Sequence, residues 1–549
     1  MRLKDEIKTW DGATVLGVGV MVATTVLAAV IVLGSQLWAL LAGTSLPWNP
    51  VRLALMLWRG NLEMSWSWWA CCALVVVLPL VLWLWVRRAR RGKGRRRVRG
   101  DQAAHRTGKP GDTRSLMPVQ ARAKAERLGV TSKVCGLPVG RAVRTGKPLV
   151  TDFESVCTGV AGPRTGKTTC WVIPRILVAP GAVVSTSNKR DVVDATREAR
   201  QEQGRCWVFD PQGIADEPQR WWWNIMDYVT DAVSARALAE IFQDTTRPPE
   251  AQVSAYFDAA ARDLVACLLL AAARSGRPLT ELHTWLNDLN DDEPVVLLKD
   301  AGENLSADTL RGIMALVPET RSGVYGSAST MMSFLLNAQA IRWVTPSPWL
   351  EQLDPREFVK STDTLFALSQ EGRGSATPIV TALTVAVTEA AVEHAKTQPA
   401  GRLSVPMLIE LDEAANVCKW RELPDMYSHF GSRGICVDTV LQSWSQGVTA
   451  WGEAGMKKLW SASNVKVYAG GVSERAFLSD LSELIGSWWA DSIQVSHSSQ
   501  GQSTSRSLQS QQRNIATVSD LQALPPGRAW VFASGATPVL AELVPWWRN

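Results

Sequence analysis

The cysteines of this 549-residue chain lack the spacing of a zinc ribbon or of a disulfide framework. There are nine of them, and no two form a Cys-x-x-Cys pair, so a reducing compartment is the simpler interpretation. A strong net charge is also missing, because 58 Lys and Arg face 52 Asp and Glu. The hydrophobic share of 46% excludes a wholly disordered or collagen-like chain, and the length predicts more than one domain.

Charge is absent altogether from two N-terminal stretches. Neither 12–51 nor 64–86 contains a charged residue or a histidine. At 1.5 Å per residue, the apolar segments 12–34 and 64–86 are each long enough to cross a bilayer core of roughly 30 Å. Tryptophans gather near their ends, as in an interfacial aromatic belt. We therefore expect two transmembrane helices rather than a buried hairpin, since soluble helices of this length rarely lack charge.

Basic residues are distributed unevenly around these two segments. Residues 87–99 contain nine Lys and Arg and no acid, whereas the intervening loop, about 43–63, has only Arg52 and Arg59. The positive-inside rule places both ends of this anchor, 1–99, in the cytoplasm. The basic run serves as a stop-transfer anchor, or contacts nucleic acid or anionic lipid. The nine positive charges of this basic run exceed the net charge of the whole chain, which is +6. Net charge therefore gives no argument for DNA binding by the rest of the chain.

The remaining residues divide by their pattern. Residues 100–134 are polar with Gly and Pro, which is typical of a linker. From about 135, short apolar runs alternate with helix-like stretches, which predicts an α/β domain with a parallel sheet over 135–227 and 351–549. Between them, 228–350 shows only helical patterns and is interpreted as an all-α domain. The predicted strands are 182–187, 206–210, 364–368, 406–411, 435–441 and 465–468. The Ser- and Gln-rich residues 491–512 form a flexible loop or an exposed polar hairpin.

A phosphate-binding loop follows an early apolar run. Residues 161–169 have the spacing of a P-loop, with alanine in place of the first glycine. Small residues let backbone N–H groups surround a phosphate, and the next helix adds its N-terminal dipole, although Pro174 should restrict or kink that helix. Lys167 is expected to reach the β- and γ-phosphates, and Thr168 to bind Mg²⁺. The predicted nucleotide-binding residues are Ala161, Gly162, Pro163, Arg164, Thr165, Gly166, Lys167, Thr168 and Thr169.

Two adjacent carboxylates end the predicted strand at 406–411. In P-loop ATPases the first acid at such a strand end holds Mg²⁺ through water, and a neighbouring glutamate polarises the attacking water. Asp412 fits the metal role and Glu413 the role of base. Glu410 is a departure, since an acid inside the strand should face the opposite side from Leu411.

Several phrases together resemble the type IV secretion coupling proteins, the TraG/TraD-like conjugative DNA-transfer ATPases. They are Gly162-Pro-Arg-Thr-Gly-Lys-Thr168, Val183-Val-Ser-Thr-Ser-Asn-Lys189, Trp207-Val-Phe-Asp-Pro211 with Trp223-Asn224, Leu411-Asp-Glu-Ala-Ala-Asn416, Ser432-Arg-Gly434, Gln442-Ser443 and 464–471. The phrase at 411–416 is far more specific than the P-loop alone. The resemblance covers most of the chain. It implies a RecA-like P-loop motor, a capping all-α domain and a homohexameric ring at the bacterial inner membrane, multi-pass, with the motor and N-terminus cytoplasmic.

Roles for two further residues are implied by the resemblance. Gln442, at the end of the strand 435–441, is expected to sense the γ-phosphate, and Arg433 to act in a neighbouring subunit as an arginine finger. The family implies that ATP hydrolysis with Mg²⁺ delivers relaxase-bound single-stranded DNA, or proteins, to a secretion channel. Lys189, Asp210 and Trp223 are interpreted as strand-end and packing positions. Arg164 departs from the family pattern, which favours a smaller residue.

Other functions remain open at this stage. An FtsK-type double-stranded DNA translocase is one alternative, but no basic winged-helix module follows the motor. A substrate-recruiting adaptor that binds nucleotide without hydrolysing it is another. An ABC exporter is disfavoured because there is no Leu-Ser-Gly-Gly signature.

Overall fold

The computed structural model describes residues 12–60, 65–91, 100–109, 111, 113–247, 254–372, 374–497 and 504–548. Its contacts group the chain into two compact units, Met1–Arg97 and Val98–Asn549.

The described residues of the N-terminal unit form the helices α2 (Gly12–Ala42), α3 (Pro50–Trp58) and α4 (Trp66–Arg91). Helices α2 and α4 pack closely, because Gly34 leaves room for Cys72 that a Cβ would fill, and Trp68 Nε1 donates to Ser35 Oγ at 3.0 Å. Among the described residues, one helical stretch, Thr24–Ala42, is long and apolar enough to cross a membrane, and Trp66–Val81 is apolar but shorter. The first helix therefore runs past the predicted end at 34.

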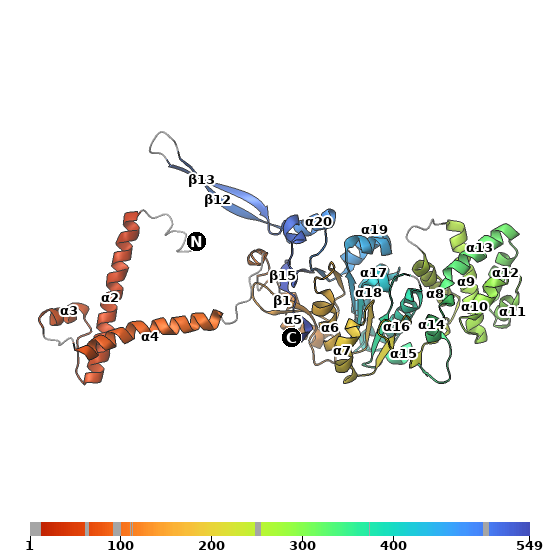
Figure 1. The fold of residues 1–549 in the computed structure, drawn as a ribbon, viewed down its shortest axis with the longest axis horizontal. Coiled ribbons are helices and arrows are strands. Elements are labelled where there is room, and N and C mark those ends of the chain that lie inside the picture. The colour runs from red at the N-terminus through yellow and green to blue at the C-terminus, as the bar shows by residue number, and fades with distance from the viewer. Residues whose placement is uncertain are drawn as a thin grey trace. The chain divides into compact units, whose positions relative to one another are not determined.

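The second unit is built around a sheet of eleven strands in its described residues (Figure 1). From β11 to β5 every neighbouring pair is parallel, and the strands on the other side of β11 are antiparallel. This confirms an α/β domain with a large parallel sheet. In sheet order the strands are β2 (Pro148–Thr151), β1 (Leu137–Ala142), β15 (Val539–Glu542), β14 (Arg528–Ala533), β11 (Val465–Tyr468), β3 (Cys157–Val160), β10 (Ile435–Leu441), β9 (Met407–Asp412), β4 (Val183–Ser187), β8 (Thr364–Leu368) and β5 (Cys206–Phe209).

Both faces of the parallel part are covered by helices, which is why its strands are continuous apolar runs. Alternate residues belong to different cores: Ile409 packs in the core that includes α16 and α18, whereas Leu408 packs in the core that includes α6 and α7. The covering helices are α6 (Ile173–Val178), α7 (Asp191–Gln201), α15 (Pro355–Phe358), α16 (Thr377–Thr397), α17 (Ala414–Val417), α18 (Leu423–Ser432), α19 (Trp444–Ala462), α20 (Arg475–Ile485) and α21 (Val518–Gln522).

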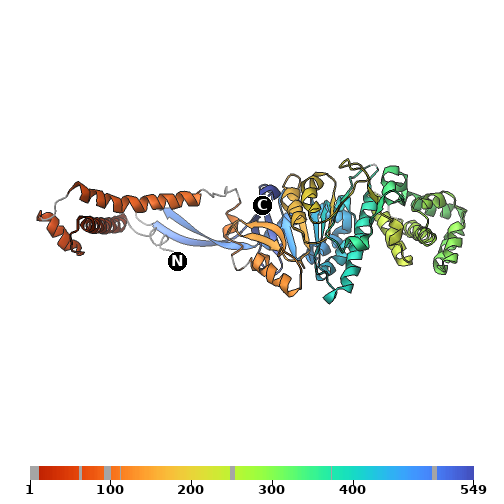
Figure 2. The ribbon, with the colours of Figure 1, turned by 90° about the horizontal axis from the view of Figure 1, so that it is seen from below.

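Helices alone form the regular structure described between β6 (Trp221–Trp222) and β7 (Glu351–Gln352). The two short strands pair in parallel and so bring the ends of this insertion together. In Figures 1 and 2 its helices (green) gather at the end of the unit opposite to the hairpin β12–β13. They are α8 (Ala232–Thr246), α9 (Ala255–Ser275), α10 (Glu281–Asn287), α11 (Glu293–Asp300), α12 (Asn304–Met314), α13 (Pro318–Met331) and α14 (Ala338–Ile341).

The segment 100–134 is not the linker that its composition predicts. Its helix α5 (Pro118–Arg127) buries Ala121, and Leu116 just before it is also buried. Asp101 forms an ion pair with the buried Arg528 at 2.8 Å. Polar residues predominate here because a short helix on the sheet's flank exposes most of its surface, while small alanines make the contact.

A long hairpin occupies the Ser- and Gln-rich region. Strands β12 (Ser487–His497) and β13 (Thr504–Asn514) pair in antiparallel register from Ser487 opposite Asn514 to His497 opposite Thr504. Of the two forms considered for 491–512, the hairpin is the one observed. At its base, Arg106 lies over the ring of Trp488, and Trp489 is exposed.

Candidate nucleotide site

Four neighbouring strands end at the candidate site. In the sheet they lie in the order β3, β10, β9 and β4, and all are parallel. The P-loop follows β3, Gln442 follows β10, the Asp412–Glu413 pair ends β9, and Asn188 follows β4. Because the carboxyl ends of parallel strands share one edge of the sheet, residues far apart in sequence meet there.

The backbone of the P-loop is anchored at its start and strained within. Ala161 N donates to Leu441 O, and Gly162 N donates to Gly470 O, both at 2.9 Å. Ala161 has no positive φ, so its Cβ is tolerated where the family pattern has glycine. Arg164 instead adopts φ 60°, a left-handed conformation that costs a non-glycine residue roughly 1 kcal/mol. Its side chain is exposed, so this departure strains the loop without blocking it.

The helix after the loop begins with an irregular turn. Residues Thr168–Val172 form a π-helical turn, and α6 begins at Ile173 with Pro174 in its first turn. Proline lacks the N–H that a continuous α-helix would use and fits best in a first turn. The helix after the P-loop therefore accommodates Pro174 by changing from a π-helical turn to an α-helix just before it.

Lys167 and Thr168 are held directly against the two acids. Lys167 Nζ lies 2.8 Å from Glu413 Oε1 and 3.4 Å from Asp412 Oδ1. Thr168 Oγ1 donates to Asp412 Oδ2 at 2.9 Å. The structure therefore brings together four residues that the sequence places about 245 positions apart.

The two acids differ in their electrostatics. Burial raises the pKa of Asp412 above its ordinary value, although Lys167 and Thr168 act against this. Burial alone would also raise the pKa of Glu413, but hydrogen bonds and charge from Lys167, with the Gln442 amide and Lys189, lower it. Glu413 is therefore ionised at neutral pH, as a proton acceptor must be.

The same residues fit a magnesium ion. Within the described residues, the buried Asp412 Oδ1 accepts no hydrogen bond. The Thr168 hydroxyl beside it supplies a second oxygen, and Mg²⁺ prefers oxygen ligands.

Comparisons with known proteins agree with this geometry. Residues 406–526 match the family model described as the TraM recognition site of TraD and TraG. The bacterial conjugative coupling protein TrwBdeltaN70, in its unbound monoclinic form, is 17% identical, with a TM-score of 0.54 over 77% of this chain and 91% of that one. The resemblance to the TraG/TraD-like coupling proteins is confirmed. Plasmid coupling protein TrwB in complex with ADP and Mg²⁺ is 16% identical, with a TM-score of 0.55 over the same shares. A search of curated proteins gives no match.

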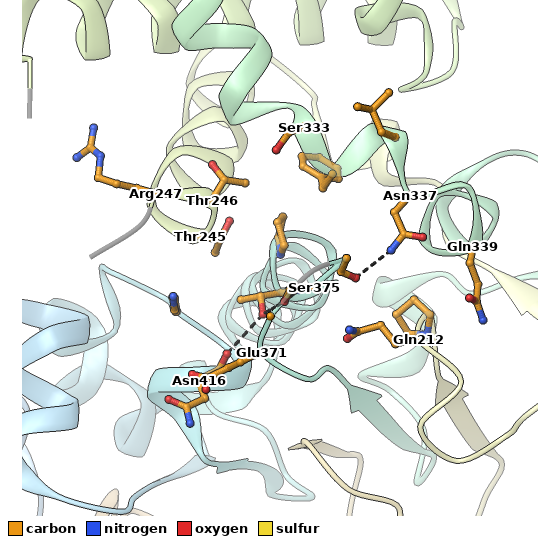
Figure 3. A pocket seen from close by; sticks show the side chains of 18 residues that line it. Gln212, Thr245, Thr246, Arg247, Ser333, Asn337, Gln339, Glu371, Ser375 and Asn416 are labelled. Carbon is orange, nitrogen blue, oxygen red and sulfur yellow. Dashed lines mark hydrogen bonds between the residues drawn. The ribbon is translucent and has the colours of Figure 1, made fainter. Parts of the chain in front are cut away.

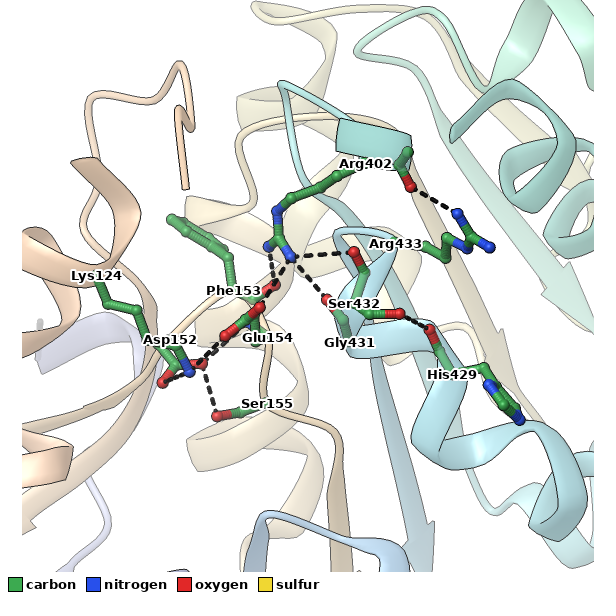
Figure 4. A network of polar contacts seen from close by, with 11 residues as sticks. Lys124, Asp152, Phe153, Glu154, Ser155, Arg402, His429, Gly431, Ser432 and Arg433 are labelled. Atoms are coloured by element: carbon green, nitrogen blue, oxygen red, sulfur yellow. Dashed lines mark hydrogen bonds and ion pairs between the residues drawn. The ribbon is translucent and has the colours of Figure 1, made fainter. Parts of the chain in front are cut away.

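The resemblance assigned roles to Gln442 and Arg433, and the structure places these two residues at opposite edges of the sheet. Gln442 lies at the site, where its side chain hydrogen-bonds Glu413 and its backbone N donates to Gln446 Oε1 at 2.9 Å. Arg433 lies at the other edge of the sheet, at the end of α18 and before β10. Figure 4 shows it beside Arg402, and its Nη1 donates to Gly401 O at 3.0 Å. Arg433 is therefore outside the site of its own chain.

Glu410, the acid inside strand β9, belongs to a buried cluster. It is fully buried beside Asp438, its register partner on β10, and its Oε2 lies 3.7 Å from Arg175 Nε. Arg175, on α6, donates through Nη2 to Asp438 Oδ1 at 2.9 Å. Burial, followed by the charge of Asp438, raises the pKa of Glu410 well above its ordinary value. Its surroundings inside the sheet therefore disfavour the ionised form of Glu410.

Asn188 is a site residue that sequence reasoning missed. Its Nδ2 donates to Glu413 Oε2 at 2.7 Å. Of the phrase 183–189, only Lys189 is interpreted from the sequence, as a strand-end position. The available signal was that Asn188 directly follows a strand, as Asp412 and Gln442 do.

A cavity of about 990 Å³ lies near these strand ends (Figure 3). The helical insertion contributes Arg247 and Asn337, the segments after β5 and β8 contribute Gln212 and Glu371, and α17 contributes Asn416. Amide and hydroxyl groups predominate among its labelled side chains, so the cavity is suited to a polar occupant.

Proposed function

We propose that this chain is a membrane-anchored coupling ATPase of a type IV secretion or conjugation system. The observation that carries the proposal is the contact of Lys167 and Thr168 with Asp412 and Glu413. It lies at the carboxyl edge of a sheet whose fold is that of TrwB. The nucleotide complexes of TrwB support ATP and Mg²⁺ as the ligands.

The geometry assigns a part of the reaction to each residue. The backbone of the P-loop cradles the phosphates, and Lys167 exchanges its carboxylate partners for phosphate oxygens. Thr168 and Asp412 hold Mg²⁺, which when bound neutralises charge on the phosphates. Water attacks the γ-phosphorus, its proton passes to Glu413, and ADP leaves; Gln442, which contacts Glu413, orients the reacting groups.

The partners follow from the resemblance. We propose that the chain delivers relaxase-bound single-stranded DNA, and proteins, to the transfer channel. The match at 406–526 favours contact with a relaxosome component of the TraM kind. The ring is a homohexamer in which Arg433 serves the site of a neighbouring subunit. Two transmembrane helices, in α2 and α4, anchor it in the bacterial inner membrane with N-terminus and motor in the cytoplasm.

A mating assay combined with an ATPase assay tests the proposal. Lys167→Ala should abolish ATP hydrolysis and DNA transfer, because the phosphate charge loses its partner, while the protein still reaches the membrane fraction. Lys457→Ala, which removes an exposed lysine of α19, is the matched control and should leave both activities intact. Transfer at the wild-type frequency by Lys167→Ala would refute the site.

The same assays separate the alternatives. If wild-type protein hydrolyses no ATP in the presence of DNA and partners, the substrate-recruiting adaptor replaces the motor. Stimulation by double-stranded DNA alone, with no relaxase requirement for transfer, would favour an FtsK-type translocase.

A further inference from the structure

We propose that Asn188 is a positioning residue that restrains Glu413 and thereby limits ATP turnover in the absence of cargo. The inference rests on the proposed function, because it assumes that Glu413 accepts the proton from the attacking water. It adds to that function a residue that holds the base rather than one that touches the nucleotide.

Both oxygens of Glu413 are engaged. Oε1 pairs with Lys167 Nζ at 2.8 Å, and Oε2 accepts from Asn188 Nδ2 at 2.7 Å. Lys167 has an alternative partner, since phosphate oxygens compete for it, whereas Asn188 has none on the nucleotide side. A carboxylate held by a neutral donor loses freedom of rotation. The Asn188 bond is therefore a restraint on Glu413 for which the phosphates do not compete.

The backbone of Glu413 is itself in an unusual conformation. Its φ of 55° is left-handed, which is rare for a residue with a long side chain. Such strain persists only where surrounding contacts hold it. Together with the bond to Asn188, it indicates that the position of Glu413 is imposed by neighbouring elements and can change when they do.

Asn188 is in turn linked to the cavity. Its backbone O accepts from Gln370 Nε2 at 3.2 Å. Gln370 follows β8, and its N donates to Gln212 Oε1 at 2.8 Å, while Gln212 Nε2 returns a bond to Gln370 O at 3.3 Å. Gln212 lines the cavity in Figure 3, beside residues of the helical insertion. A displacement of Gln212 is thus carried through Gln370 to Asn188, and from there to Glu413.

The test uses the full chain in detergent with ATP and Mg²⁺, with and without single-stranded DNA. Asn188→Ala should raise the DNA-free kcat about tenfold, the size expected for one hydrogen bond to a charged group. The KM for ATP should stay unchanged, because Asn188 does not contact the P-loop in any hydrogen bond described. Stimulation by DNA should shrink accordingly. Asn188→Asp, which keeps the shape but removes the donor, should behave in the same way.

Two further variants complete the experiment. Gln370→Ala should give a smaller rise in the DNA-free kcat, and the double variant with Asn188→Ala should add little, since both act on one bond. Asn290→Ala, on an exposed turn of the insertion, should match the wild type. A merely structural role for Asn188 would lower kcat and cannot raise it.

Each result decides the matter. A fall of kcat in Asn188→Ala, or no change in the DNA-free rate, overturns the inference while the wild-type ATPase upholds the proposed function. If the wild type is silent but Asn188→Ala hydrolyses ATP, the restraint is confirmed. If neither hydrolyses ATP, the proposed function and the inference both fail.

Discussion

Two clusters of charge are carried by the same strand, β9, and they behave differently. At the strand's end, Lys167 meets Asp412 and Glu413. Two residues earlier, Arg175 meets Glu410 together with Asp438 of β10. Both clusters tie the P-loop and its helix to β9, and both set one cation against two acids.

The difference lies in how the second acid is compensated. Inside the sheet, Arg175 pairs with Asp438, and burial raises the pKa of Glu410. At the edge, Glu413 has its pKa lowered by Lys167, and Asp412 keeps an oxygen without a hydrogen bond in the described residues. Oxygens of Glu410 and Asp438 also accept no hydrogen bond in the described residues, but they lie inside the sheet, whereas the Asp412 oxygen lies beside the Thr168 hydroxyl at the sheet's edge. The two clusters thus differ in where their unsatisfied oxygens lie.

The largest expected effect is at the edge cluster. Glu413→Gln should lower ATP turnover by about 10²–10⁴-fold, since the water loses its proton acceptor. Nucleotide binding should persist, because Lys167 and the P-loop are unchanged. Steady-state hydrolysis measures the turnover, and a fluorescence assay measures ATP binding. Turnover at the wild-type rate in Glu413→Gln would contradict the distinction between the two clusters.

The inner cluster should show its effect in stability. Arg175→Met should lower the free energy of unfolding by about 3–5 kcal/mol, because Asp438 would be left buried without its partner. Denaturant unfolding of the detergent-solubilised chain measures this. Arg190→Met, which removes an exposed ion pair with Asp194, serves as control and should show no measurable loss. An unchanged midpoint in Arg175→Met would show that the inner cluster is not structural.

Metal dependence should separate the acids further. Asp412→Asn should raise the Mg²⁺ concentration needed for half-maximal hydrolysis by about 10–100-fold, as is typical when a metal's supporting ligand is removed. Titration of Mg²⁺ at saturating ATP measures the shift. The prediction fails if the variant and the wild type have the same Mg²⁺ requirement.

The smallest effect should be at Glu410. Because its folded pKa is raised, the wild type keeps its full stability below the unfolded value near 4.5 and loses stability as pH rises. Glu410→Gln mimics the neutral acid, so it should match the wild type near pH 4.5 and be the more stable of the two at neutral pH. Thermal melts between pH 4.5 and 8 compare the two. A variant less stable than the wild type at neutral pH would show that Glu410 is ionised.

The sequence predicted those features that depend on local pattern. The strands at 364–368 and 435–441 were placed at their observed ends, since apolar runs of this length are typical of buried parallel strands. The P-loop and the acids at 412–413 were proposed because their residue types follow from phosphate and metal chemistry; the structure brings them into contact, and their roles stay predictions.

What remained hidden depends on neighbours distant in sequence. Asn188 resembles any polar residue after a strand until β4 is placed next to β9. Glu410 looked anomalous because its partner Arg175 lies over 200 residues away, on a helix whose packing the sequence does not state. The contacts of 100–134 with the sheet are made by alanines, by Leu116 and by the ion pair of Asp101 with Arg528, and such scattered residues form no periodic pattern in the sequence.

The paired strands β6 and β7 have a consequence for how such a chain can change over evolution. The chain enters the helical insertion after Trp221 and Trp222. It comes back to the sheet domain at Glu351 and Gln352, which pair with those two tryptophans. Since exit and re-entry are adjacent, the helices between them can be lengthened, shortened or exchanged without altering the order of the strands. The insertion is thus a replaceable module that joins the sheet at a single point of attachment.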